Sequence, residues 1–421
     1  MVKSALPKTS LNINKISKPD GNILRSLASR VSDLAARPGE EVKRQLWYRH
    51  NSLEATPPLI FCDPENGWGE IITPEMLACQ GELARQWEWR LRREIFWGEQ
   101  MGDDRVVEAY FDIPHVYSGL EWGLVERRIG GDHGGAYRWD APIKTEADLE
   151  KLHFPTAQVD EHATLQLAEQ AEEIFGTTLK VRVKTSWWWT LGMTQTLAHL
   201  RGLEQIMVDM IEAPDFLHRL MGFLRDGTLS LLDELTNNNL LSLNCDGTYV
   251  GSGGFGWTRE LPGPDFRGVV RPCDMWGFAE SQETIGVSPR MFAEFIFPYQ
   301  VSVLDKFGLN CYGCCEPIDT RWHIVQQIPR LRRVSVSPWS NRSRMAELLG
   351  DQYIFSMKPN PADLAMTTFD EDRIRLEMRQ ALQQTRNCRV EVIMKDNHTI
   401  NHDPQRILKW VKIVRQETEG L

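Results

Sequence analysis

Three cysteines and a glutamate lie close together in the segment 308–319, GLNCYGCCEPID. Cys311 comes first, and the adjacent pair Cys314 and Cys315 is followed directly by Glu316. Thiolates act as nucleophiles and metal ligands, and a carboxylate can donate a proton or add a further ligand. A disulfide between adjacent cysteines closes a strained eight-membered ring, so a disulfide is disfavoured. Catalysis, metal binding and burial of free thiols remain open.

Eight short apolar segments, each followed by a polar or glycine-containing loop, are predicted to be strands. Long amphipathic helical patterns, such as 202–235 and 288–308, separate most of them. Strands that alternate with helices indicate a parallel sheet, and eight such units predict a (β/α)8 TIM barrel of the α/β class. The predicted strands cover residues 58–63, 106–113, 179–185, 240–247, 308–313, 332–339, 353–360 and 389–397.

An N-terminal extension precedes the predicted barrel. Residues 1–20 are polar with Pro and Gly, which indicates a loose arm, and residues 23–37 have apolar residues at helical spacing. Gly39 is the expected end signal of that helix. We therefore predict an arm and helical cap over residues 1–55 and one barrel domain over residues 56–421.

Composition limits the classes of partner. The chain has 421 residues, of which 42% are hydrophobic and 25% charged, as is typical of a globular protein with a large core. A net charge of -10 and the lack of any Lys/Arg block argue against a nucleic-acid partner. No apolar run has the length of a membrane span, and the N-terminus lacks a secretory signal pattern. We expect a cytoplasmic protein that binds a small molecule or another protein, a homodimer included.

Active-site residues of a (β/α)8 barrel lie where the strands end, so the strand-to-loop junctions are the places to search. These junctions are polar in this sequence, and two of their acids, Asp246 and Glu316, are candidates to protonate a leaving group, as is Glu283 outside them. The polar junctions are 62–70, 111–115, 184–189, 244–249, 310–316, 337–341, 358–361 and 395–399.

Fifteen tryptophans are a high number for one chain, and several fall at the predicted junctions. Packing in the core explains many of them, because aromatic rings bury large apolar areas. The others suit a pocket for an aromatic ligand or a methyl-bearing cation, and the sequence does not choose between the two. The predicted substrate-binding residues are Trp68, Trp187, Trp188, Trp276 and Lys358.

The segment GSGGFG (251–256) has the glycine spacing of a dinucleotide-binding loop. The following residues, WTRELPGPDF, contain two prolines and are a poor start for the helix that would hold a pyrophosphate. A flexible loop is therefore the favoured interpretation. The sequence contains no Walker loop, no H-E-x-x-H and no G-x-S-x-G motif.

Residues 273–319 resemble the uroporphyrinogen decarboxylase superfamily. They combine an Asp-containing strand end, a helix that opens with Ser-Pro and contains Phe and Pro-Tyr, and a strand that ends at the site. The segments 358–365 and 390–416 fall where the superfamily places its last two strands and final helix, and the resemblance covers roughly residues 55–416. It implies a (β/α)8 barrel with one of two chemistries. These are cofactor-free decarboxylation of a tetrapyrrole and methyl transfer to or from a corrinoid protein, usually with zinc.

The sequence departs from the pattern of both branches. The decarboxylases clamp their substrate with an arginine-rich loop after the first strand, whereas residues 62–70 here are acidic and contain no arginine. The methyltransferases have His-x-Cys on the strand similar to LNCYG and a further Cys on the last strand. Asn310 and Tyr312 occupy the first two positions here, and Asn397, followed by His398, lies near the third.

A displaced zinc site is one hypothesis that this comparison leaves open. Residues two apart share a face of a strand, so Asn310, Tyr312 and Cys314 are expected to point the same way, with the first two orienting the substrate or its leaving group. A cysteine-containing site without metal is the alternative. The expected zinc ligands are Cys314, Cys315 and His398, with Glu316 and Cys245 as further donors.

The resemblance favours a methyltransferase that takes a methyl group from a small donor, preferably a methoxylated aromatic, and passes it to a corrinoid (cobalamin) protein. The sequence contains no D-x-H-x-x-G corrinoid-binding signature, so the corrinoid would be bound to a partner protein. The alternatives are methyl transfer from a corrinoid to a thiol or tetrahydrofolate, and cofactor-free decarboxylation of a smaller acid. A non-enzymatic small-molecule binding protein is the alternative from a different class.

Overall fold

The computed structural model describes residues 15–130 and 137–419, so most of the predicted arm lies outside the described residues. Parallel strands form two sheets, one with the order β1-β12-β11-β10-β9-β8 and one that pairs β2 with β7. The α/β class with a parallel sheet is therefore confirmed. The strands are β1 (Leu59–Cys62), β2 (Tyr110–Ile113), β7 (Lys180–Val183), β8 (Trp276–Ala279), β9 (Leu309–Tyr312), β10 (Leu331–Val336), β11 (Ile354–Met357) and β12 (Arg389–Met394).

The strand order is that of a barrel in which the last strand returns to the first. Leu59 of β1 pairs with Glu391 of β12, and Trp276 of β8 pairs with Leu309 of β9, in parallel register. Closure is not shown, because within the described residues no ladder joins β1 to β2 or β7 to β8. The closed (β/α)8 barrel stays a prediction.

One predicted strand is wrong, and one strand of the parallel sheets was not predicted. Residues 240–247 form no strand, whereas β8 forms in a segment that was not among the eight predicted. The missing strand at 240–247 is explained by the side chain of Asn244, which takes the place of backbone hydrogen bonds to β8. Its Oδ1 accepts from the Trp276 amide at 2.9 Å, and its Nδ2 donates to the Trp276 carbonyl at 3.0 Å.

Long helical patterns of the sequence are interrupted at prolines. The predicted helix 202–235 is split into α7 and α8 before Pro214, and 288–308 is split into α9 and α10 before Phe297 and Pro298. Gly39 does not end a helix but lies in the first turn of α2. The helices of at least seven residues are α1 (Lys18–Ala35), α2 (Pro38–Asn51), α4 (Glu82–Phe96), α5 (Glu161–Phe175), α6 (Thr194–Arg201), α7 (Leu203–Glu212), α8 (Pro214–Asn237), α9 (Pro289–Phe295), α10 (Phe297–Leu304), α12 (Arg342–Leu349), α14 (Glu371–Gln384) and α15 (Gln405–Glu419).

Short elements complete the fold. The region 114–150 contains β3 (Tyr117–Ser118), which pairs with β6 (Gln158–Val159), and the hairpin strands β4 (Arg127–Gly130) and β5 (Tyr137–Asp140). The one-turn helices are α3 (Trp68–Ile71), α11 (Trp322–Val325) and α13 (Ala362–Ala365), and the remaining 3-10 and π segments are 65–67, 74–76, 97–101, 146–151, 272–274 and 282–284.

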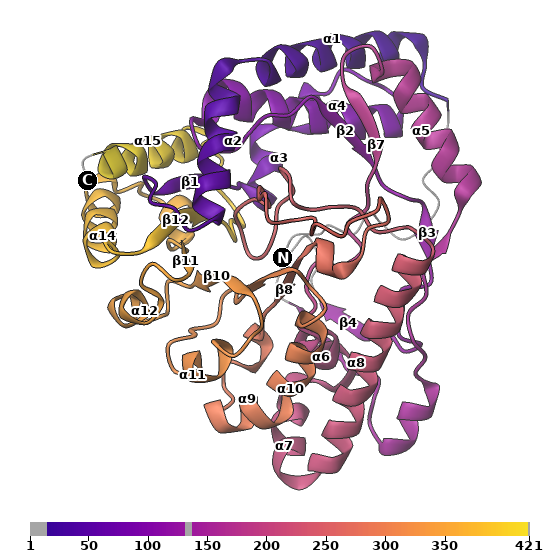
Figure 1. Cartoon of the computed structure of the whole chain (residues 1–421). Helices are drawn as coiled ribbons and strands as arrows, with labels where there is room; N and C mark the ends of the chain where they lie inside the picture. Colours follow the sequence, from indigo (N-terminus) through magenta and orange to yellow (C-terminus); the bar gives the residue numbers. More distant parts are fainter. Residues whose placement is uncertain (1–14, 131–136, 420–421) are drawn as a thin grey trace.

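The N-terminal helices pack on the strands rather than standing apart. In Figure 1, α1 runs along α4 at the edge that β2 and β7 occupy, and α15 lies next to β1. Leu24, Ala28, Val31 and Leu34 of α1 recur at helical spacing and are buried in one apolar cluster with α4 and α5. The predicted boundary at residues 55 and 56 falls between α2 and β1, and the division into cap and barrel stays a prediction.

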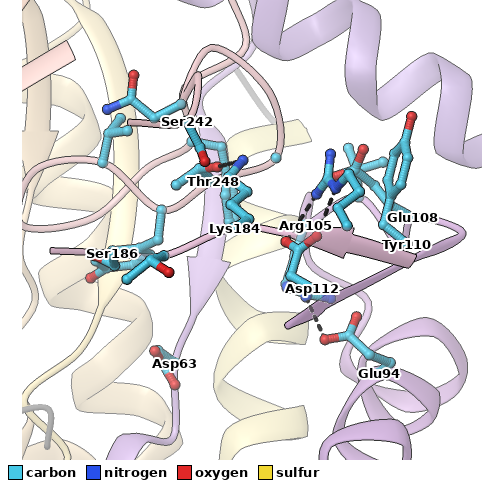
Figure 2. A pocket seen from close by; sticks show the side chains of 18 of the residues that line it. Asp63, Glu94, Arg105, Glu108, Tyr110, Asp112, Lys184, Ser186, Ser242 and Thr248 are labelled. Atoms are coloured by element: carbon cyan, nitrogen blue, oxygen red, sulfur yellow. Dashed lines mark hydrogen bonds and ion pairs between the residues drawn. The ribbon is translucent and has the colours of Figure 1, made fainter. Parts of the chain in front are cut away.

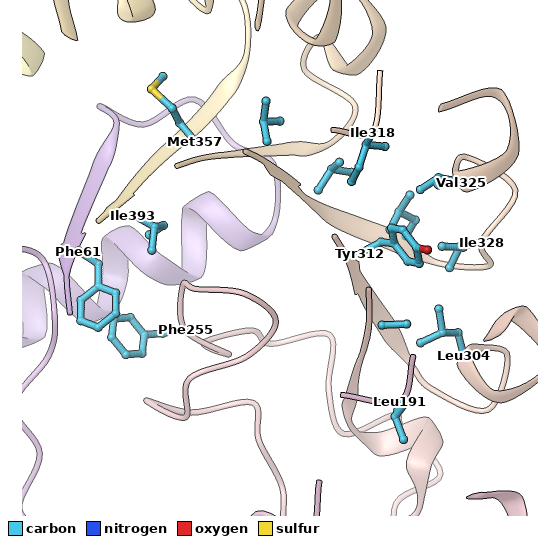
Figure 3. Packing of buried hydrophobic residues seen from close by; sticks show 14 of the residues in the cluster. Phe61, Leu191, Phe255, Leu304, Tyr312, Ile318, Val325, Ile328, Met357 and Ile393 are labelled. Atoms are coloured by element: carbon cyan, nitrogen blue, oxygen red, sulfur yellow. The ribbon is translucent and has the colours of Figure 1, made fainter. Parts of the chain in front are cut away.

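The glycine-rich segment 251–256 is a loop, as predicted, but it is buried in the core. It lies against the inner side of the strands, where Phe255 packs on Phe61 with ring centroids 4.8 Å apart (Figure 3). Gly253 has a φ of +131°, and an added Cβ would lie 2.4 Å from Cγ2 of Ile393. Glycine is needed at this position because no side chain fits between the segment and β12.

Substitution Gly253→Ala is expected to reduce the free energy of unfolding by about 2–4 kcal/mol, because it adds backbone strain and a clash in a packed core. Gly268 is the matched control: its φ is +96°, and an added Cβ would meet nothing within 4 Å. Gly268→Ala should therefore show the backbone strain alone, about 1–2 kcal/mol. Urea unfolding of both variants measures the difference, and equal losses would contradict the packing described for Gly253.

No helix in the described part of the chain has both the length and the apolar character needed to cross a membrane.

Candidate active site

A cavity of about 520 Å³ lies at the carboxyl ends of β1, β7 and β12 and extends past β2 to α4; we call it the central cavity. Aromatic and charged residues line its walls, and Figure 2 shows several of the charged ones, such as Asp63, Glu108 and Lys184. The aromatic residues include Trp97, Trp187, Trp188, Trp189, Tyr249 and Trp276, the cations are Arg90, Arg93, Arg105, Arg182, Lys184 and Lys395, and the acids are Asp63, Glu94, Glu108 and Asp112.

Three of the five predicted substrate-binding residues line this cavity: Trp187, Trp188 and Trp276. Trp68 does not line it but donates its Nε1–H to Asp63, which does, at 3.2 Å. Lys358 is buried away from the cavity, where its Nζ donates to Ser356 Oγ at 2.6 Å, and burial lowers the pKa of Lys358 to about 7. A substrate contact of Lys358 does not follow from this geometry.

Asp246 is fixed by cations beside the cavity. Its carboxylate accepts from Lys184 Nζ at 2.8 Å and from Arg182 Nη1 at 3.2 Å, and Thr248 also donates to it. Burial alone would raise the pKa of Asp246, but the charge of Lys184 outweighs this and lowers it. Asp246 is therefore ionised at neutral pH and is suited to positioning Lys184, not to the predicted role of proton donor.

Glu108 is an acid of the cavity that the sequence analysis did not select. It lies two residues before Tyr110 and four before Asp112, and all three line the central cavity (Figure 2). Burial, together with the nearby charge of Asp246, raises the pKa of Glu108 to about 7. The signal was present in the sequence, since alternate residues of VVEAYFDI are polar and must share one face of the strand.

Asn310 and Tyr312 do not line the central cavity, so this geometry does not support a role for them in orienting a substrate there. Asn310 Nδ2 donates to the carbonyls of Leu304 and Pro329 at 2.9 and 2.7 Å. Tyr312 is buried, donates to Gln300 Oε1 at 2.9 Å, and lies with Leu304 among apolar residues on the helix side of β9 (Figure 3).

Cys314 does not continue the row of Asn310 and Tyr312. Gly313 between them has a φ of +93°, which turns the backbone and breaks the alternation of the strand. Cys314 therefore packs in one buried cluster with Cys311, on the opposite face of β9. The predicted common face of Asn310, Tyr312 and Cys314 is wrong for this reason.

Cys314 is surrounded by donors. Ser252 Oγ lies 3.3 Å from its Sγ, Lys395 Nζ lies 3.7 Å away, and Cys315 Sγ lies 3.6 Å away. The hydrogen bond from Cys315 and the charge of Lys395 lower the pKa of Cys314 to about 6, although burial opposes this. The nucleophilic thiolate form is thus the one this environment stabilises.

The predicted zinc ligands do not form a metal site. His398 is exposed and its described partner is Asn66, at 3.5 Å, while the ammonium of Lys395 already neutralises Cys314. Among the residues that the structure describes, no three His, Cys, Asp or Glu side chains gather in a way that could hold a metal ion. Cys314, Cys315 and His398 therefore do not fit zinc, and no step is assigned to it.

Glu316 and Glu283 lie outside the cavity lining. Glu316 is buried and accepts from the amides of Ser281 and Cys314 at 2.8 and 2.9 Å, so it holds the turn after β9; burial raises its pKa to about 7. Glu283 accepts from Thr194 Oγ1 at 2.8 Å. Neither carboxyl lines the central cavity, so neither is placed to protonate a substrate there.

A thiol of this protein is expected to titrate near pH 6. Thiolate absorbance should rise through about pH 6 in the wild type and lose this step in Cys314→Ser, because Cys314 is stabilised as a thiolate. Cys388→Ser is the control, since burial raises the pKa of Cys388 to about 11. A first thiol titration above about pH 8, the range of ordinary cysteines, would contradict the described environment.

No protein-family model and no curated protein matches the sequence. Among solved structures, a methyltransferase from Methanosarcina mazei superposes with a TM-score of 0.50 over 90% of this chain and 97% of that chain. The two sequences are 13% identical in this alignment. The chain thus shares the fold of a methyltransferase, and its resemblance to the uroporphyrinogen decarboxylase superfamily stays a prediction.

Proposed function

We propose that the chain is a methyltransferase that removes a methyl group from a small methoxylated aromatic bound in the central cavity. The observation on which this rests most is Glu108, a carboxyl with a pKa raised to about 7 in a cavity walled by tryptophans. A cavity of about 520 Å³ has the size of sites that bind one small ligand. The fold shared with a methyltransferase agrees with this proposal.

Demethylation of an aryl ether is slow unless the departing oxygen is protonated, because a free phenolate is a poor leaving group. Glu108 in its protonated form can supply that proton. Lys184, fixed by Asp246 and Thr248 at 2.8 and 2.6 Å, lies in the same cavity and would stabilise negative charge on the oxygen. The walls of Trp187, Trp188 and Trp276 would hold the aromatic ring.

A corrinoid on a separate protein would supply the nucleophile that accepts the methyl group. The central cavity has the size of a small-ligand site, so we expect the corrinoid partner to approach the bound donor from outside. What this chain contributes is substrate binding, exclusion of water and the proton from Glu108.

A second candidate function is decarboxylation of a small aromatic acid without a corrinoid. The observation that favours it is the basic lining: the loop 62–70 contains no arginine, but Arg90, Arg93 and Arg105 reach the central cavity from α4 and from the segment before β2. This reaction releases CO₂ and needs no methyl acceptor, so the two candidates are separated by their products.

The proposed function is tested by anaerobic incubation of the purified protein with cob(I)alamin and a panel of methoxylated benzoates, methoxyphenols and quaternary amines. We expect methylcobalamin and the free phenol in equal amounts from a methoxylated aromatic. Glu169→Gln, an exposed position on α5, is the control and should behave as the wild type. Phenol formation without methylcobalamin, or CO₂ release without cobalamin, would refute methyl transfer.

A further inference from the structure

The loop 244–249 approaches Glu108 closely at a glycine. A Cβ added to Gly247 would lie 2.1 Å from Oε2 of Glu108 and 3.0 Å from its carboxyl carbon. The same Cβ would lie 3.3 Å from Cζ2 of Trp257. Glu108 and Gly247 both line the central cavity. The carboxyl of Glu108 thus occupies the space in which any other residue at position 247 would have its side chain.

The loop is held in place on both sides of Gly247. The amide of Thr248 donates to Asp246 Oδ1 at 3.0 Å, and the carbonyl of Thr248 accepts from the Gly256 amide at 2.9 Å. The side chain of Asn244 is fixed by its two hydrogen bonds to the backbone of β8. A side chain added at position 247 is therefore expected to displace the carboxyl and not the loop.

The backbone around Glu108 is also fixed. The amide of Val107 donates to Glu40 Oε2 at 2.7 Å, and the carbonyl of Ala109 accepts from the Lys180 amide at 2.8 Å. These two contacts attach the segment to α2 on one side and to β7 on the other. Only the torsions of its own side chain can therefore move the carboxyl of Glu108.

Packing, and not hydrogen bonding, holds that carboxyl. Within the described part of the chain it takes part in no hydrogen bond, and the cations Arg182 and Lys184 pair instead with Asp246, at 3.2 and 2.8 Å. Arg44 of α2 is the remaining charged group that acts on Glu108. The place of the carboxyl among these four charges thus depends on the space that the loop leaves for it.

We propose that Gly247 is a positioning residue for Glu108: the space left by its missing side chain seats the Glu108 carboxyl in the central cavity. This inference rests on the proposed function, in which Glu108 protonates the departing oxygen. A larger residue at position 247 would turn the carboxyl away from the loop. Because a proton donor must lie within hydrogen-bond distance of that oxygen, a displacement of about 1 Å is enough to slow the chemical step.

Gly247→Ala tests the inference directly, since it adds one methyl group at a residue whose φ lies outside the left-handed region. We expect kcat to fall about 100-fold, the cost of misplacing a catalytic group by about 1 Å, and KM to change little. Gly39→Ala is the control, because Gly39 is exposed in the first turn of α2 and an added Cβ would meet nothing within 4 Å. A wild-type kcat in Gly247→Ala would overturn the inference.

A double-mutant cycle distinguishes a positioning role from a merely structural one. If Gly247 acts through Glu108, Gly247→Ala should slow the wild type but not Glu108→Gln, in which the proton donor is already lost. The midpoint of urea unfolding should stay close to the wild-type value, because the displaced atom is the end of a flexible side chain. A further loss of about 100-fold in the double variant would show damage to the loop itself and overturn the inference.

Titration of Glu108 without substrate or cobalamin separates this inference from the proposed function. Carbon-13 NMR of the full chain with labelled glutamate side chains measures it, and Glu108→Gln assigns the signal. Burial and the charge of Asp246 raise the pKa of Glu108 to about 7 in the wild type. In Gly247→Ala the carboxyl leaves this position, so its pKa should move to a lower value.

The two proposals can therefore fail independently. A lowered pKa of Glu108 in Gly247→Ala, together with a wild type that transfers no methyl group, would support the role of Gly247 and refute the methyltransferase. Methyl transfer by the wild type, with the same kcat and the same Glu108 titration in Gly247→Ala, would support the methyltransferase and overturn the role of Gly247.

Discussion

Glu108→Gln is expected to lower the rate of methyl transfer by about 10²- to 10⁴-fold, the usual contribution of a general acid. Glutamine keeps the size of the side chain and its hydrogen-bonding capacity but has no proton to give to the departing oxygen. Because the loss occurs in the chemical step, kcat should fall and KM should stay near the wild-type value. Steady-state kinetics with a methoxylated benzoate and cob(I)alamin measure both parameters.

The pH profile gives an independent signature of the same carboxyl. The pKa of Glu108 is raised to about 7 by burial, and the active form of a general acid is the protonated one. The wild-type rate should therefore be constant at low pH and fall as the pH rises through about 7. Glu108→Gln should lack this inflection, and Glu169→Gln should retain it. A wild-type rate that increases through pH 7 would contradict the assignment.

The sequence predicts the fold through periodicity, because each strand and helix is a local pattern. Seven of the eight predicted strand positions contain strands, as judged by the bounds of β1, β2, β7, β9, β10, β11 and β12. The failure at 240–247 came from a tertiary contact, since the Asn244 side chain takes the hydrogen bonds that a strand would have made with Trp276. The periodicity of a sequence does not show where side-chain hydrogen bonds will take the place of backbone hydrogen bonds.

The candidate site was predicted less well, for two physical reasons. A search of the strand-to-loop junctions finds residues such as Asp63, Lys184 and Lys395, which line the cavity. Position alone does not say which of the junction residues has a perturbed pKa. Arg93 lies in the last turn of α4, which is not the end of a strand, so a search of the strand-to-loop junctions does not include it. The cavity extends from β1 past β2 to α4, and among the described residues no ladder joins these two strands. This arrangement arises only in the assembled fold.

The common face predicted for Asn310, Tyr312 and Cys314 shows how one residue changes an interpretation. Alternation holds within β9, where Asn310 and Tyr312 both point to the helices, and it ends at Gly313. Glycine at a strand end is a signal that the backbone can leave the extended conformation. The prediction placed Asn310, Tyr312 and Cys314 on one face of the strand, although the backbone turns at Gly313, before Cys314.

Glu391→Gln is expected to reduce the free energy of unfolding by about 3–5 kcal/mol, because it leaves a buried guanidinium without its counterion. Arg333 Nε lies 2.9 Å from Glu391 Oε1, and both side chains are essentially inaccessible to solvent. His50 of α2 lies 3.4 Å from the same carboxylate, so the pair also connects the N-terminal helices to the strands. Urea unfolding measures the loss.

The pH dependence of stability has a sign that follows from the same ion pair. Burial alone would raise the pKa of Glu391, but the charge of Arg333 outweighs it and lowers the pKa to about 2. An unfolded glutamate has a pKa of about 4.3, so the stabilisation is fully present above that pH and is lost as the pH falls toward about 2. The wild type should lose stability over this range more steeply than Glu391→Gln.

A double variant separates two contributions to the free energy of unfolding: the cost of leaving one buried charge unpaired, and the net contribution of the ion pair itself. Arg333→Met with Glu391→Leu removes both charges, and we expect it to be more stable than either single variant, since apolar side chains of similar size avoid the desolvation of the ions. The exposed pair Arg30–Glu99 is the control, and Glu99→Gln should cost less than about 1 kcal/mol. If the double variant were the least stable, the pair would be favourable in itself and the hydrogen bond from Arg333 Nη2 to Asn51, at 2.7 Å, would be the next contact to remove.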